Sequence, residues 1–78
     1  MSRKVYVTVD LKYDTTGIIT PLKIIWKSGK EYIIERVIHV CQIGPEVIKY
    51  VVLIGGLQKN LFNENKRWYV EAIDKDSK

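Results

Sequence analysis

His39 and Cys41 are the one pair of residues in this chain whose types are suited to catalysis. They lie two positions apart, so on a β-strand both side chains point to the same face, with Cα atoms roughly 6.5 to 7 Å apart. A thiol beside an imidazole can act as a nucleophile, but the reaction also needs a group that orients the imidazole and donors that stabilise an oxyanion. The sequence shows neither group.

A structural role accounts for this pair more simply. Free cysteine is among the most buried residue types and packs as a small apolar side chain, so we expect Cys41 to be buried. Zinc needs three or four ligands, whereas the chain holds one histidine and one cysteine. The nine carboxylates form no pair with acid and base spacing, and the glycines lack the spacing of a phosphate-binding loop. We therefore expect no enzyme activity, no catalytic residue, no metal and no cofactor.

Basic and aromatic residues offer a second kind of chemistry. Small barrels that grip single-stranded nucleic acid use lysines against phosphates and aromatic rings against bases. Six such side chains fall in the outward phase of the expected strands, or beside them: Tyr6, Lys12, Lys23, Lys27, Arg67 and Tyr69. No RNA-binding signature accompanies them, so a solvated face with scattered lysines is the simpler interpretation.

The size and composition of the chain limit the remaining possibilities. Its 78 residues suffice for one small domain, with residues 74–78 as a frayed tail. The net charge of +4 favours anionic partners in general, without selecting one. Residues 50–57 form the longest charge-free apolar stretch, which is too short to span a bilayer, so we expect no membrane partner. A single cysteine and an alternating start without a signal-peptide core favour the cytoplasm.

Short strands are the elements that must position these residues. An apolar period of two, interrupted by turn residues, predicts six strands at 5–13, 18–27, 31–43, 46–54, 57–62 and 67–73. Pro21 predicts an edge or a bulge in the second strand, and a phase slip at Glu35 and Arg36 predicts a bend in the third. Pro45 and Gly55 would suit the ends of a helix, but five of the nine residues at 46–54 are Val or Ile, which favours a strand.

These elements predict an all-β fold, a six-stranded antiparallel meander that closes into a small SH3-like barrel. The alternation assigns five aromatic residues to the core: Trp26, Tyr32, Tyr50, Phe62 and Trp68. Tyr6 and Tyr69 fall in the opposite phase and are expected to be exposed.

Residues 24–37 contain the pattern Ile-x-Trp-x-x-Gly-x-x-Tyr-x-Ile, followed by a basic residue and Val. Further along the chain stand Tyr50, the segments 54–56 and 61–62, and residues 67–71. With these residues in this order, two-thirds of the chain, from Ile24 onward, resembles a family of small uncharacterised bacterial all-β proteins. The resemblance implies a compact β fold and carries no assigned activity or site. Glu64-Asn65-Lys66 departs from it, because an Asp-Gly pair is expected in that turn.

Function therefore rests on surfaces. Ile19, Ile25 and Ile73 fall in the outward phase, and exposed apolar residues usually mark contact surfaces. We expect a non-catalytic binding module that meets a protein partner, or forms a homo-oligomer, through an edge strand or an exposed apolar face. The alternative is a weak, sequence-tolerant RNA- or DNA-binding barrel that uses the six residues named above.

Overall fold

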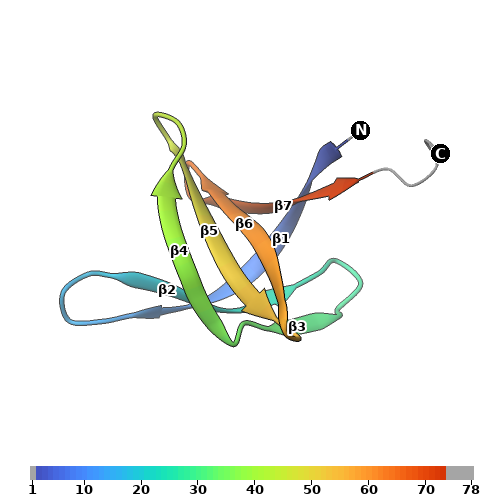
Figure 1. The fold of residues 1–78 in the computed structure, drawn as a ribbon, viewed down its shortest axis with the longest axis horizontal. Coiled ribbons are helices and arrows are strands. Elements are labelled where there is room, and N and C mark those ends of the chain that lie inside the picture. The colour runs from blue at the N-terminus through green and yellow to red at the C-terminus, as the bar shows by residue number, and fades with distance from the viewer. Residues whose placement is uncertain (1, 74–78) are drawn as a thin grey trace.

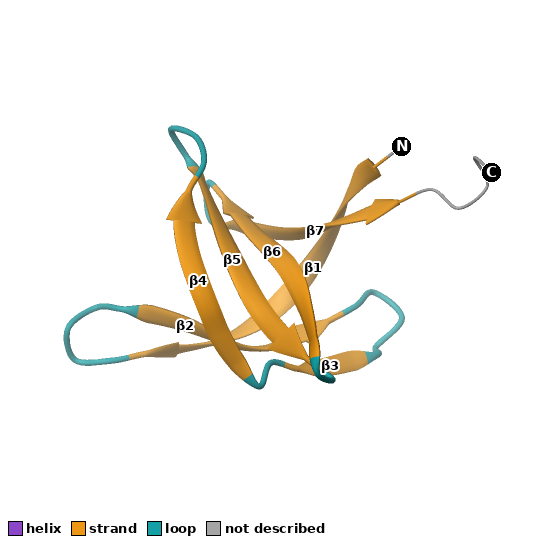
Figure 2. Ribbon diagram, viewed as in Figure 1, coloured by secondary structure: helices purple, strands orange, loops and turns teal. Residues whose placement is uncertain are grey.

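The computed structural model describes residues 2–73, and the side chains of residues 3–71. This part of the chain forms seven antiparallel strands (Figures 1 and 2). They are β1 (Ser2–Tyr13), β2 (Ile19–Ile25), β3 (Glu31–Ile33), β4 (Arg36–Gln42), β5 (Val47–Ile54), β6 (Leu57–Glu64) and β7 (Arg67–Ile73). The described part of the chain holds no helix of the length and apolarity that a membrane crossing needs. The tail expected to fray, residues 74–78, lies outside the described residues.

The turns follow from their residue types. Gly55 and Gly56 both have positive φ, at 59° and 78°, and join β5 to β6 in a two-residue turn. Asn65 and Lys66, with φ angles of 51° and 71°, form a two-residue turn between β6 and β7. Such a turn favours glycine, and this hairpin forms it without one. The strand at β5 confirms that its Val and Ile residues outweigh the potential helix ends at Pro45 and Gly55.

The strand order is β3-β2-β1-β7-β6-β5-β4, and β1 joins the two halves of this sheet. Residues 2–7 of β1 pair with β7, and residues 8–13 pair with β2. On β2, Lys23 pairs with Asp10 and Pro21 with Leu11, so Leu22 is an extra residue in a bulge. The bulge beside Pro21 confirms the expected irregularity, and together these features let the sheet curl.

Residues 34 and 35 replace the bend expected in the third strand with a corner. The backbone N–H of Ile34 donates to the Leu22 carbonyl of β2 at 2.9 Å, and that of Glu35 donates to the Leu53 carbonyl of β5 at 2.8 Å. Two successive residues therefore bond to opposite halves of the sheet. The chain cannot continue as one strand here, so the prediction of six strands is wrong and the fold has seven.

The curled sheet forms a half-barrel with its apolar core on the inner face. The buried centre consists of Ile24, Ile34, Tyr50, Val52 and Leu61, and the partly buried rings of Trp26, Tyr32 and Trp68 pack against it. Four of the five aromatic residues assigned to the core are confirmed there. The fifth, Phe62, is buried on the opposite face, because its neighbour Leu61 points inward. In the strand order, β3 and β4 lie at the two ends.

Candidate functional site

His39 and Cys41 lie on β4, and both are exposed. The Cys41 thiol contacts the backbone carbonyl of Gln42 at 3.7 Å. The expectation that Cys41 is buried is therefore wrong, because β4 is an end strand and nothing in the described chain covers its outer face there. Residues 2–73 also hold no group of three His, Cys, Asp or Glu side chains placed to bind a metal ion.

Three aromatic rings form a second apolar cluster on the outer face of the sheet. Phe62 and Tyr69 stack with ring centroids 5.0 Å apart and planes 8° apart, and Tyr6 meets Tyr69 edge to face at 5.8 Å. These residues occupy neighbouring register positions on β6, β7 and β1. Tyr69 is only 4% exposed, so the expectation that it faces solvent is wrong. We call Tyr6, Phe62 and Tyr69 the outer aromatic cluster.

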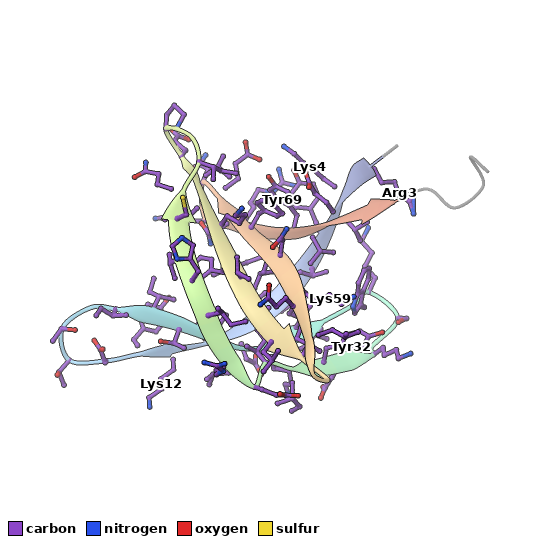
Figure 3. All side chains as sticks on the ribbon, viewed as in Figure 1. Arg3, Lys4, Lys12, Tyr32, Lys59 and Tyr69 are labelled. Atoms are coloured by element: carbon purple, nitrogen blue, oxygen red, sulfur yellow. The ribbon has the colours of Figure 1, made fainter. Side chains whose placement is uncertain are left out.

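Cations cover this cluster. The Lys4 ammonium lies 4.9 Å from the centre of the Tyr69 ring, and the Arg67 guanidinium lies 4.0 Å from the centre of the Tyr6 ring. Lys4 and Tyr69 are labelled in Figure 3. Lys4 also forms a 2.9 Å ion pair with Glu64, and this hydrogen bond raises the pKa of Lys4. Burial raises the pKa of the Tyr69 phenol. The faces of these rings are therefore used within the fold, which leaves little of Tyr69 for stacking against a base.

The structure brings only part of the expected nucleic-acid set together. Tyr6 and Tyr69 belong to the outer aromatic cluster, and Arg67 lies over the Tyr6 ring. Lys23 is half-buried between two carboxylates, Glu31 at 3.1 Å and Asp10 at 3.6 Å, and the hydrogen bond to Glu31 raises its pKa. Lys12 lies apart from Lys4 and Tyr69, on the hairpin that projects from the body (Figure 3).

A shallow hollow lies where β1 passes from β7 to β2. Its lining residues are Tyr6, Val7, Thr8, Ile25, Trp26 and Lys27. Val7 is the last residue of β1 in register with β7, and Thr8 is the first in register with β2, so the hollow marks the crossing point. Lys27 thus joins Tyr6 here, with Arg67 on the Tyr6 ring.

Most of the exposed large apolar side chains of the described residues lie elsewhere, on and just after β4 and on the projecting hairpin, while Ile33 on β3 and Leu57 on β6 are exposed singly. We call residues 11–21 the arm; it consists of the paired ends of β1 and β2 and the turn between them, and it extends past β4 in Figure 1. Tyr13 is 66% exposed next to the turn of the arm, and Ile18 and Ile19 are exposed beside it. On and just after β4, Val40 and Ile43 are each 51% exposed.

The three apolar residues that were expected to face outward differ in their exposure. Ile19 is exposed, Ile25 is only partly exposed, and the side chain of Ile73 lies outside the described residues. Val40, Ile43 and Tyr13 were missed. The alternation assigns Tyr13 and Ile43 to the apolar phase of their strands and Val40 to the opposite phase. In the structure Val40 lies opposite the buried Tyr50, so it is on the inner face, and it stays exposed because its strand lies at the open side of the half-barrel.

The free edge of β4 presents backbone groups as well as side chains. The Ile43 N–H donates to the Val47 carbonyl at 3.0 Å, and in an antiparallel pair every second residue points its backbone N–H and C=O toward the neighbouring strand. His39, Cys41 and Ile43 therefore point these groups toward β5. Val40 and Gln42, which lie between them, point their N–H and C=O groups away from β5. This edge can accept the backbone of another extended segment.

Comparison of the chain with known protein families, with curated proteins and with solved structures gives no match.

Proposed function

We propose that this protein is a non-catalytic interaction module that binds an extended protein segment by adding it as a strand beside β4. One observation carries the proposal: β4 is an end strand whose Val40 and Gln42 backbone groups point away from its partner, with exposed apolar residues on the same strand and directly after it. Main-chain hydrogen bonds would supply affinity, and alternate side chains would supply specificity.

An added strand would also extend the curl of the sheet. We propose that the occupied form approaches a closed, SH3-like barrel, because the two end strands already meet at the corner of residues 34 and 35. The exposed, unpaired thiol of Cys41 is most compatible with a reducing compartment such as the cytoplasm.

The test uses extended peptides selected from a displayed random library against the whole protein. Selected peptides should slow hydrogen exchange at Val40 and Gln42 and should bind Val40→Pro at least about tenfold more weakly, because proline removes the outward N–H. Val40→Thr is the matched control, since it keeps the N–H and the preference for a strand. Peptides that bind Val40→Pro equally well, or protect only β1 or β7, would contradict the proposal.

A second candidate, weak nucleic-acid binding, is favoured by the hollow at the β1 crossing, where Tyr6, Lys27 and Arg67 come together. Anisotropy of a labelled single-stranded oligonucleotide at low salt tests it. Lys27→Glu should weaken binding and flatten its salt dependence, because one phosphate contact is lost. Lys12→Glu makes the same charge change on the distant arm. Equal effects of the two variants, or no binding to the wild type, would rule this candidate out.

A further inference from the structure

We infer that the segment that pairs with β4 is β4 of a second copy of this chain, so that the protein is a two-fold symmetric dimer with one continuous sheet. This inference rests on the proposed function, because it uses the same free edge, and it names the occupant. The reasons are the apolar side chains exposed beside the edge, the residues of the edge itself, and the symmetry of the pairing.

Apolar side chains are exposed beside the free edge. Among the described residues, five of the eight exposed large apolar side chains lie on the arm or on and just after β4: Tyr13, Ile18, Ile19, Val40 and Ile43. The arm projects past β4, on the side of the sheet where a second copy would lie (Figure 1). Exposed apolar residues gathered in this way usually mark a contact surface.

The sequence of β4 suits pairing with itself. If Val40 lies opposite Val40 of the partner subunit, the central positions hold no Lys, Arg, Asp or Glu, and each His39 faces a Cys41 of the partner subunit. The charged residue of the strand, Arg36, lies at one end, so antiparallel pairing places the two Arg36 side chains at opposite ends of the interface. Like charges directly opposite each other would destabilise a strand pair, and this register avoids them.

Symmetry also favours β4 against β4 over β4 against the other end strand, β3. Pairing of β4 with β3 of the next copy is head to tail and leaves free edges that continue into a filament. Pairing of β4 with its own copy closes after two chains. The short β3, of three residues, also offers fewer backbone groups than the seven residues of β4.

Sedimentation velocity over a range of protein concentrations tests the inference. We expect the wild type and Val40→Thr to be dimers at micromolar concentrations and Val40→Pro to be monomeric, with a dissociation constant raised at least about tenfold. Circular dichroism should show the same strand content in all three proteins, since the Val40 N–H is not used within the chain. Ile33→Thr on β3 should remain dimeric.

Each other outcome has a definite meaning. A wild type that stays monomeric at high micromolar concentration, or a dimer that survives Val40→Pro, overturns the inference. A dimer lost in Ile33→Thr would place the interface at β3. If the wild type is monomeric but selected peptides still bind it and fail to bind Val40→Pro, the dimer is wrong while strand addition at β4 stands.

Discussion

Tyr69 illustrates, at the scale of single residues, why an alternating pattern can identify a face and still misjudge exposure. Its phase was predicted correctly, since it lies on the face opposite the core. It is nevertheless buried, because Phe62 and Tyr6 occupy the neighbouring strands at the same level and Lys4 covers its ring. Phe62 lies in the same hairpin as Tyr69, but Tyr6 and Lys4 come from β1 at the other end of the chain, so no local pattern could show the whole cluster.

Replacing Tyr69 by alanine should therefore cost stability as a core substitution does. We expect Tyr69→Ala to lower the free energy of unfolding by about 2 to 3 kcal/mol, at the low end for a buried ring, because the covering cations can relax into the space. Urea denaturation measures the change. Tyr69→Phe is the control and should cost less than about 1 kcal/mol, because it keeps the ring. An alanine variant as stable as the wild type would show that the cluster contributes nothing.

Asp14 organises the turn of the arm and makes its stability dependent on pH. Its Oδ1 accepts hydrogen bonds from the Thr16 hydroxyl at 2.6 Å, the Thr16 N–H at 2.8 Å and the Ile18 N–H at 3.0 Å. These hydrogen bonds lower the pKa of Asp14, and the bond from the Thr16 hydroxyl has the largest effect. A carboxylate whose pKa is lower in the folded state stabilises the fold above its unfolded pKa, and the stabilisation is lost as pH falls through the folded pKa.

We therefore expect the wild type to lose stability on acidification, below the ordinary pKa of an aspartate, more steeply than Asp14→Asn. The asparagine keeps an acceptor at the same position but does not titrate, so it serves as the matched variant. Denaturation midpoints measured over a series of acidic pH values give the comparison. Parallel pH curves for the two proteins would contradict a role for this carboxylate.

At the scale of elements, local patterns predicted most strands and turns, and long-range bonds decided the rest. The strand at β5 and the turns at Gly17, Gly29 and Gly55-Gly56 follow from residue types that act within a few positions. The division of one expected strand into β3 and β4 does not. It depends on the bonds from Ile34 to β2 and from Glu35 to β5, whose acceptors are 12 or more residues away.

The turn between β6 and β7 offers a stabilising substitution. Lys66 has a φ of 71°, a conformation that glycine adopts without a steric penalty and other residues adopt at a cost of about 1 kcal/mol. Lys66→Gly should raise the free energy of unfolding by roughly 0.5 to 1 kcal/mol, because the resulting Asn-Gly pair suits this turn. Lys66→Ala also removes the side chain but keeps the Cβ, and it should give no gain. Equal stability of the two variants in urea would show that the turn is not strained.

At the scale of the whole molecule, the curl of the sheet could be predicted but its extent could not. Small size and alternating strands predict a sheet that bends around one core. Whether its ends meet depends on the position of the corner and on the bulges at Leu22 and Ile38, which set how far each half turns. The candidate surfaces depend on the same geometry, which explains why β4 was predicted as part of a strand but not as a free edge.

Dimerisation through β4 also has a thermodynamic signature. A dimer becomes more stable against unfolding as the protein concentration rises, because a higher concentration favours the associated, folded state. The apparent melting temperature of the wild type and of Val40→Thr should rise with concentration, and that of Val40→Pro should not. Differential scanning calorimetry at several concentrations measures this, and an unchanging wild-type midpoint would argue for a monomer.

The one thiol of the chain lies on this same strand and is exposed. A fluorophore attached there by maleimide coupling needs no engineered residue and reports on a single known position. Its emission would respond to whatever covers the neighbouring edge, so one labelled sample could serve for screening peptides, second copies and oligonucleotides in the same assay.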